Sequence, residues 1–515
     1  FLETTRRRNM VSLSVLLLLS YYFSSHAAAK DNEVVDPTRT ILWGPGLNPE
    51  RVTMRARYFF IQLYDNYGRN ITRSPGNEIV SAEIKGQTEH GQSCHIWTQV
   101  LDCNDGSFIV RYKLYDTCLN LRIDVRVKKE LVALKPSVFK GPVFEEECHC
   151  PNPSVDAWLN DYECPESYSQ IDDDLKLFPS VDYDQIRNSI IKEYHKPNSV
   201  SICHYVVKSN KVHRQCYGQH VGFKIFMDSL LLSLARKVVL PDTEFFMNLG
   251  DWPLVPMHKE LYPMFSWCGS RDSRDIVLPT YDITESSLES MGRVMLDMLS
   301  VQGNTKVPWE KKIEKLFWRG RDSRRERLDL IDIARKHPDL FNASITNFFF
   351  LKDEVEKYGP ATRHISFFDF FRYKYQLNID GTVAAYRFPY LLAGDSLVFK
   401  QESKYYEYFY RHAVPGMHYM PVKSDLSDLV KKVRWAKDHD EAARKISKAG
   451  RYLMRDTALP RDVLCYHVSL LREWNRRIKS KVRVLEDMEE VPQPEHSCDC
   501  NRALETDSID SKDEL

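Results

Sequence analysis

The stretch 242-DTEFFMNLGDWPL-254 carries the main signal for the fold of the larger part of this chain. Its apolar and aromatic segment, Glu244–Leu249, is typical of a buried strand. The strand is followed by a carboxylate, Asp251, and Pro253 restrains the backbone just beyond it. Ligands of open α/β sheets bind outside the carboxyl ends of the strands, so Asp251 is a candidate functional residue. A side chain that only caps a turn is the alternative interpretation.

Helix and strand signals alternate through residues 146–490. Val221–Lys237 has helical periodicity and a basic last turn, and a final amphipathic helix is predicted at roughly Arg461–Glu486. Further strand signals occur at residues 315–319, 375–379 and 396–400. This alternation predicts an α/β structure with parallel sheet, and its length predicts two Rossmann-like halves.

Residues 30–145 show a different pattern, in which short strands alternate with turn signals such as Asp105-Gly106. Runs including Arg57–Leu63 and Ser107–Tyr115 are rich in aromatic and β-branched residues. The pattern predicts an immunoglobulin-like β-sandwich. Three motifs resemble a filamin-type repeat: 43-WGPGL-47, 104-NDGSFIVRY-112 and 135-KPSVF-139. No catalytic cluster occurs in this stretch, which favours a structural or docking module.

Both ends of the chain carry address signals. Residues 1–29 combine arginines, a short apolar run and alanines, which is typical of a cleaved signal peptide. The apolar run is shorter than the roughly 20 residues of a transmembrane helix, so no membrane insertion is expected. The terminal KDEL predicts residence in the endoplasmic reticulum lumen and the KDEL receptor as a partner. Residues 491–515 are acidic and contain prolines, and we expect a disordered tail.

Twelve cysteines fit an oxidising compartment. Cys203 and Cys216 flank a turn and could bridge a hairpin. We interpret the Cys148–Cys150 motif as disulfide chemistry rather than as a zinc site. Two glycosylation acceptors, Asn70 and Asn342, would lie at the surface if they are used.

Lysine plus arginine and aspartate plus glutamate both number 72, so the formal net charge is zero. This balance argues against a nucleic-acid-binding surface spread over the protein. Basic residues are nevertheless concentrated in 318-WRGRDSRRER-327, directly after a predicted strand. These arginines could clamp a diphosphate, with one or two of them facing inward, or they could form a solvated helix face.

A third candidate site follows the predicted strand at 375–379. Gly381 and small residues precede a helix start there, and such a turn exposes backbone N–H groups that can bind phosphate. Arg387 adds positive charge, although the loop has neither a dinucleotide nor an ATP fingerprint. The acidic groups at Asp172–Asp174 and Asp438–Asp440 are interpreted as a polar loop and a charged helical stretch, so we expect no metal site.

Together these segments resemble the CAP10-type protein O-glucosyltransferases, in particular the members with a filamin-like repeat and a KDEL terminus. The matching segments are 248-NLGDWP-253, 317-FWRG-320, 379-IDGTVAAYR-387, 396-SLVF-399 and 418-HYMPVKSDL-426. The resemblance implies a GT-B glycosyltransferase fold for residues 146–490 and an inverting, metal-independent transfer. It also implies UDP-glucose as the donor and a serine hydroxyl of a folded EGF-like repeat as the acceptor.

The resemblance also implies roles for individual residues. Asp251 would be the catalytic base, and Arg319 would contact UDP. Further UDP contacts are implied in the loop, at Gly381, Thr382, Val383, Ala384, Ala385, Tyr386 and Arg387. We expect Trp252 and Trp267, as exposed aromatic side chains, to be candidates for contact with the acceptor.

Two alternatives stay open at this point. UDP-xylose differs from UDP-glucose by one hydroxymethyl group, and the sequence does not measure the volume of the sugar pocket. The other alternative is a non-catalytic lumenal chaperone or scaffold that binds its clients through the filamin-like module.

Overall fold

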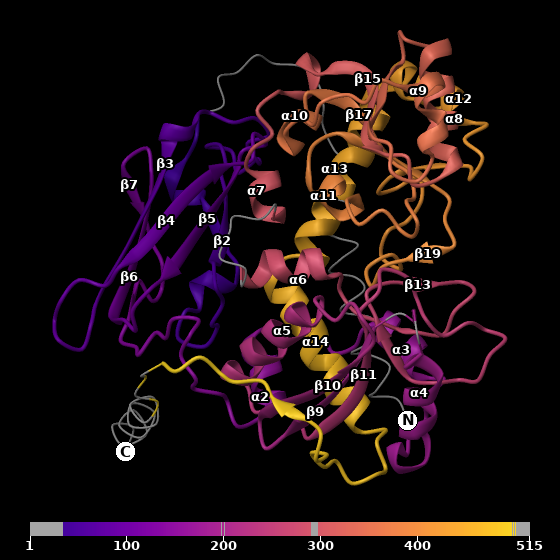
Figure 1. The fold of residues 1–515 in the computed structure, drawn as a ribbon. Helices are drawn as coiled ribbons and strands as arrows, with labels where there is room; N and C mark the ends of the chain where they lie inside the picture. The colour runs from indigo at the N-terminus through magenta and orange to yellow at the C-terminus, as the bar shows by residue number, and fades with distance from the viewer. Residues whose placement is uncertain are drawn as a thin grey trace, which may run out of the picture.

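The computed structural model of the 515-residue chain describes residues 34–196, 198–199, 201–289, 297–496, 498 and 500. The described part consists of a β-sandwich, two larger sheets that are flanked by helices, and a short two-stranded sheet (Figure 1). The predicted signal peptide and the KDEL terminus lie outside the described residues. Among the helices of the described part, none has the length and apolar character needed to cross a membrane.

The N-terminal domain is the expected β-sandwich. Its elements are η1 (Pro37–Arg39), β1 (Ile41–Trp43), η2 (Pro45–Leu47), β2 (Arg57–Gln62), η3 (Asn77–Ile79), β3 (Val80–Gln87), β4 (Ile96–Asp102), β5 (Ser107–Leu114), β6 (Leu119–Val127), β7 (Glu130–Val132) and β8 (Val138–Phe139). One sheet has the order β1-β2-β5-β4, and the other contains β3, β6 and β7, with β8 paired to β6. Gly106 in the β4–β5 turn has a φ of +83°, and a Cβ there would lie 2.0 Å from the carbonyl oxygen of Ile71. Only glycine fits this turn.

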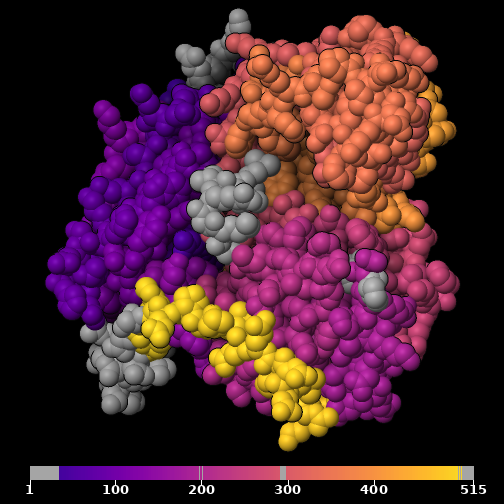
Figure 2. Space-filling model, in the orientation of Figure 1, coloured from indigo at the N-terminus to yellow at the C-terminus, as the bar shows by residue number. Residues whose placement is uncertain are grey.

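Strand β2 is buried on both faces. Phe59 and Ile61 belong to the sandwich core, whereas Tyr58 and Phe60 belong to a core that continues into the C-terminal part. Alternate residues of a strand face opposite sides, so the unbroken apolar run reflects two buried faces. The sandwich therefore packs against the rest of the protein through a core-like interface, and Figure 2 shows the indigo domain set against the remaining chain.

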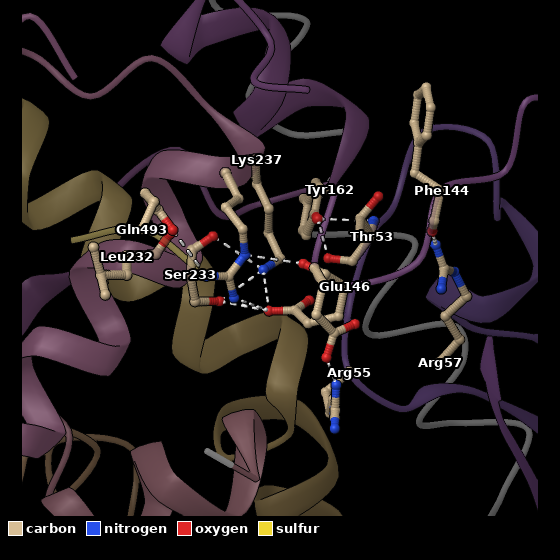
Figure 3. Close-up of polar contacts among 12 residues, drawn as sticks. Thr53, Arg55, Arg57, Phe144, Glu146, Tyr162, Leu232, Ser233, Lys237 and Gln493 are labelled. Atoms are coloured by element: carbon tan, nitrogen blue, oxygen red, sulfur yellow. Dashed lines mark hydrogen bonds and ion pairs between the residues drawn. The ribbon is translucent and has the colours of Figure 1, made fainter. Parts of the chain in front are cut away.

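A buried polar network fastens the linker that follows the sandwich (Figure 3). The Glu146 carboxylate accepts hydrogen bonds from Lys237 at 2.6 Å and Ser233 at 2.8 Å. Burial opposes ionisation of Glu146, but its cationic neighbours outweigh burial and lower the pKa of Glu146. Burial lowers the pKa of Lys237 to about 8. A second tie joins the two parts because the Tyr162 hydroxyl donates to the carbonyl oxygen of Thr53 at 2.6 Å.

The first sheet of the α/β part is mixed. Its segment contains α2 (Val155–Asp161), α3 (Ser169–Leu175), α4 (Tyr183–Tyr194), β9 (Ile202–Lys208), β10 (Lys211–Tyr217), α5 (Lys224–Lys237), β11 (Thr243–Asn248), β12 (Met264–Ser266), β13 (Gly269–Ser270), β14 (Ile276–Val277) and α6 (Tyr281–Leu288), and the strand order ends with β21 (Glu489–Glu490). The order is β14-β12-β11-β9-β10-β21. The predicted parallel pairing occurs in this sheet only among β11, β12 and β14. The remainder is antiparallel because β9 and β10 form a hairpin, which the expected Cys203–Cys216 disulfide bridges.

The second sheet is parallel throughout. Its segment contains α7 (Met298–Gln302), η4 (Trp309–Lys311), β15 (Ile313–Arg321), α8 (Arg325–Lys336), β16 (Phe341–Asn347), η5 (Lys352–Glu354), α9 (Val355–Tyr358), α10 (Phe367–Phe370), β17 (Tyr373–Asn378), α11 (Phe388–Ala393), β18 (Leu397–Gln401), β19 (Tyr405–Tyr406), β20 (Met420–Val422) and α12 (Leu429–Asp438). The order β16-β15-β17-β18-β20 is the doubly wound order, which reverses between β15 and β17. Ligands bind in the crevice at such a reversal point.

The chain then returns from the second sheet to the first. Helix α13 (Asp440–Thr457) packs on α11, and α14 (Pro460–Asn475) packs on α6 and β11. Helix α14 is shorter than predicted because the backbone beyond it pairs with Val181. The N–H of Val181 donates to Arg477 and its carbonyl oxygen accepts from Lys479, both at 2.8 Å.

Where a disordered tail was expected, the described residues 491–496, 498 and 500 make defined contacts, among them the Val491 N–H, which donates to the Val212 carbonyl oxygen at 2.8 Å. Strand β21 pairs with β10, and disulfides join Cys148 to Cys498 and Cys150 to Cys500. In Figure 2 the yellow segment crosses the surface toward the sandwich. The disulfide interpretation of the Cys148–Cys150 motif is confirmed.

Candidate functional site

A pocket of about 570 Å³ lies beyond the carboxyl ends of β11, β15 and β17. Its lining includes Asp251, the start of the arginine stretch and the loop at residues 381–387. Asp251 follows β11 of the mixed sheet. The arginines begin at the end of β15 and the loop follows β17, and the strand order of the parallel sheet reverses between these two strands. One cavity therefore joins the three stretches that the sequence singled out.

Asp251 is half-buried in the pocket wall. Its carboxylate accepts a hydrogen bond from the Tyr281 hydroxyl at 3.3 Å, and its main-chain carbonyl accepts from Tyr386 at 2.7 Å. Burial raises the pKa of Asp251, whereas Tyr281 and Arg321 act to lower it. A raised pKa makes a carboxylate a better proton acceptor.

A second carboxylate, Asp282, shares the pocket, and sequence reasoning missed it. Tyr281 and Asp282 are the first residues of α6. Burial, followed by the charge of Asp251, raises the pKa of Asp282 to about 6. Strand β14 before the helix has two residues, which is too short for a strand signal. Thr280 followed by an acidic first turn is the helix-start signal that could have marked this position.

The arginine stretch, which begins in the last residues of β15 and continues into α8, divides between the pocket and the surface. Arg319, Arg321 and Arg327 line the pocket, so three arginines face inward rather than the one or two expected. Arg324 and Arg325 instead pair with glutamates outside the pocket lining. The stretch therefore contributes to the pocket lining and to the solvated surface, and its role as a diphosphate clamp stays a prediction.

The pocket holds an excess of positive charge. Arg327 is 6% exposed and donates to the carbonyl oxygens of Asp380 at 2.8 Å and Ile379 at 3.2 Å. Burial, and then repulsion by neighbouring arginines, lowers the pKa of Arg327 to about 9. Burial lowers the pKa of Arg387 to about 10. Bound anionic groups would offset the electrostatic cost of burying these positive charges close together.

Arg319 is held by the protein itself. Its guanidinium donates to the main-chain and side-chain oxygens of Asn342, at 2.9 and 2.7 Å. It also lies 4.5 Å from the centre of the Phe317 ring. Arg321, by contrast, is exposed and forms no ion pair within the described part of the chain. Arg321 is therefore better placed than Arg319 to bind a ligand.

The predicted glycosylation acceptors are half-buried. Asn342 lies in β16, and its amide donates to the Tyr373 hydroxyl at 2.7 Å while its oxygen accepts from Arg319. The Asn342 side chain is therefore engaged by its neighbours, and whether either acceptor is glycosylated stays a prediction. Asn70 lies in an isolated bridge with Tyr64.

The loop after β17 lines the pocket with its backbone. Val383, Ala384 and Ala385 are buried, and their small side chains leave the main chain close to the cavity. Between Thr382 and Arg387, no backbone N–H has a backbone acceptor among the residues that the structure describes. These backbone N–H groups are therefore available to bind an anion, as expected for a glycine-containing turn before a helix.

The two candidate tryptophans have opposite environments. Trp252 is 48% exposed, and Asn248 donates to its carbonyl oxygen at 2.6 Å, which stabilises the turn that carries Asp251. Trp267 is fully buried and packs edge-on against Tyr281, with ring centres 5.8 Å apart. The prediction that Trp267 is exposed is wrong because it follows β12, an interior strand of the mixed sheet.

The acidic motifs that were considered as metal sites are hydrogen-bonded to other parts of the protein. Asp174 lies in α3 rather than in the predicted loop, and it accepts from the Val277 N–H at 2.9 Å. Asp440 begins α13 and accepts from Lys374 at 2.9 Å. A group of possible ligand atoms near Glu145 includes two cysteines that are already joined in a disulfide.

This arrangement supports a defined chemistry. A half-buried carboxylate, Asp251, can accept a proton from an alcohol. In the same cavity, arginines and backbone N–H groups can stabilise an anionic leaving group.

Comparison with known proteins agrees with this chemistry. Residues 159–513 match Glycosyl transferase family 90, and residues 34–138 match the Filamin/ABP280 repeat. The chain is 51% identical over 477 residues to protein O-glucosyltransferase 2 of Danio rerio, covering 92% of this chain and 94% of that protein. It is 45% identical over 487 residues to protein O-glucosyltransferase 3 of Homo sapiens, covering 92% and 95%. The chain is therefore a glycosyltransferase that belongs to Glycosyl transferase family 90 and carries a filamin-type repeat.

Proposed function

We propose that this protein transfers glucose from UDP-glucose to serine hydroxyls of folded EGF-like repeats in the endoplasmic reticulum lumen. The relatives at 51% and 45% identity are named protein O-glucosyltransferases. The CAP10-type motifs and the terminal KDEL support the acceptor class, the compartment and the KDEL receptor as a partner. In this proposal residues 146–490 form the two Rossmann-like halves of a GT-B fold.

The observation that carries the proposal is the cavity that joins Asp251 to the arginines. Asp251 removes the proton from the serine hydroxyl as the oxygen attacks the anomeric carbon of glucose. The bond from that carbon to UDP breaks on the opposite face, so the configuration inverts and UDP leaves with the electron pair. Proton transfer of this kind contributes about 10²–10⁴-fold in rate.

The leaving diphosphate is received by Arg321, Arg327 and Arg387, together with N–H groups of the loop at 381–387. Arg319 acts indirectly, because its carbonyl oxygen accepts from Arg387 at 2.5 Å and its guanidinium is held by Asn342. These cations neutralise the departing charge, and the proposal therefore includes no metal ion. Trp252, exposed beside the base, contacts the acceptor.

Mass spectrometry of a folded EGF-like repeat tests this function. The repeat is incubated with the protein and an equimolar mixture of UDP-glucose and UDP-xylose. We expect a hexose on a serine, and an unfolded, reduced repeat should stay unmodified. A pentose product would identify a xylosyltransferase. An unmodified folded repeat would contradict the transferase proposal and favour the non-catalytic scaffold.

Replacement of Arg321 by methionine should weaken UDP binding by about 1.5–3 kcal/mol, the contribution of a charged hydrogen bond. The physical reason is that Arg321 is the exposed cation of the pocket. Isothermal titration with UDP measures the effect. Arg325→Met is the matched control, because Arg325 pairs with Glu354 outside the pocket lining. Equal affinities for the two variants would contradict the assignment of Arg321.

A further inference from the structure

Two cations on the sandwich reach toward the catalytic part. Lys113 and Arg111 lie on β5, and they form ion pairs with Glu289 and Asp297 respectively. The Arg111–Asp297 pair has a separation of 3.2 Å, and its side chains are 14% and 17% exposed. The Lys113 and Glu289 side chains are 19% and 26% exposed. These pairs are better shielded from water than surface salt bridges, which contribute little.

The ring of Trp97 on β4 keeps the two cations in place. The charged groups of Lys113 and Arg111 lie 5.3 and 5.5 Å from its centre. The nitrogen of Arg111 also donates to the Gln99 side chain at 2.8 Å. The cations are therefore pre-organised on the sandwich and lose little freedom when they pair.

Glu289 connects the Lys113 pair to the pocket through a single helix. Glu289 caps the carboxyl end of α6, and its N–H donates to the Glu285 carbonyl oxygen at 2.7 Å. The opposite end of α6 carries Tyr281 and Asp282, which line the pocket. The eight residues of α6 span about 12 Å. Lys113 therefore pairs with one end of a short helix whose other end, at Tyr281, contacts Asp251.

Asp297 connects the Arg111 pair to the opposite wall of the pocket. Asp297 caps α7, where its carboxylate accepts from the Ser300 N–H at 2.7 Å. Helix α7 packs on α11, which begins directly after Arg387 and carries Tyr390 in the pocket lining. One strand of the sandwich is therefore paired with the ends of two helices, α6, which lines the cavity, and α7, which packs on a second lining helix, α11. Figure 1 shows α6 and α7 on the side of the catalytic part that faces the sandwich.

We propose that the filamin-type domain contributes to catalysis by the transferase. Lys113 and Arg111 are positioning residues that hold α6 and α7 in place, and the position of α6 keeps Tyr281 in contact with Asp251. This inference rests on the proposed function for its kinetic consequence. The core-like burial of Tyr58 and Phe60 places the sandwich firmly enough for such a role. A flexibly tethered docking module would not share its core with the catalytic part.

Charge reversal with a reciprocal swap tests the proposal. Lys113→Glu places two carboxylates together, so we expect kcat for transfer to fall by about 10–100-fold, the cost of a misplaced catalytic group. KM for UDP-glucose should stay within about twofold, because the arginines are untouched. The double variant Lys113→Glu, Glu289→Lys restores the opposite charges and should recover most of kcat. Arg126→Glu is the matched control, since Arg126 is exposed on β6 in the other sheet of the sandwich.

Hydrogen–deuterium exchange supplies a readout that needs no activity. Amides of residues 281–289 should exchange faster in Lys113→Glu and return to the wild-type rate in the swap. Wild-type kcat in the folded single variant, or a swap that fails to recover kcat, would overturn the proposal. If the wild-type protein shows no transfer, the proposed function fails, and unchanged exchange in the single variant would still overturn the positioning role.

Discussion

Asp251→Asn is expected to lower kcat for glucose transfer by about 10²–10⁴-fold and to leave UDP affinity within about twofold. An amide of the same shape keeps the contacts of the side chain but cannot accept the serine proton. The proposal assigns the base to Asp251, whose pKa is raised by burial and whose carboxylate is oriented by the hydrogen bond from Tyr281. Initial rates with a folded EGF-like repeat and calorimetric titration with UDP measure the two effects.

Asp282→Asn is the matched control for this prediction. Asp282 lies in the same pocket and has a raised pKa, but it begins α6 and accepts no hydrogen bond from Tyr281 among the described contacts. We expect its loss of kcat to be less than about 10-fold. The reverse result, an active Asp251→Asn and an inactive Asp282→Asn, would assign the base to Asp282.

Glu146→Ala should destabilise the protein by about 3–5 kcal/mol, because it leaves a buried ammonium without its partner. The Lys237 side chain is 2% exposed and cannot reach water without local opening. Figure 3 shows that this network lies where the linker meets α5. Urea unfolding followed by tryptophan fluorescence measures the change.

Two further variants identify the cause of that change. Glu146→Met combined with Lys237→Met removes both charges, so most of the lost stability should return. Asp161→Ala breaks the exposed pair between Asp161 and Arg51 at the same junction, and it should cost less than about 1 kcal/mol. A similar cost for Asp161→Ala and Glu146→Ala would show that burial of the pair does not matter.

Local sequence patterns singled out three stretches that the structure brings into one pocket lining, and the chemical roles of their residues stay predictions. The strand ending before Asp251, the arginines after β15 and the loop after β17 all converge on one pocket. The carboxyl ends of parallel strands share an edge, which places the arginines of β15 beside the loop after β17, whereas Asp251 follows a strand of the other sheet and joins them only through packing of the two sheets. The turn chemistry of Gly106 and the filamin-type motifs predicted the sandwich for the same local reason.

Contacts between distant segments could not be predicted in this way. Trp252 and Trp267 have the same side chain, yet one is 48% exposed and the other is fully buried. Asn342 carries a glycosylation motif, yet its half-buried amide is hydrogen-bonded to Arg319 and Tyr373. Burial depends on which element covers a face, and a single stretch of sequence does not contain that information.

Local periodicity and turn chemistry were enough to predict the two domain types, the positions of the candidate residues at strand ends and a disulfide across the hairpin. Long-range packing was needed to bring Tyr281 and Asp282 to Asp251, to pair the tail cysteines with those of the linker, and to place β5 beside α6 and α7. Each of these contacts joins segments far apart in the chain. They form because the sandwich and the two sheets bury apolar faces against one another, which brings those segments together.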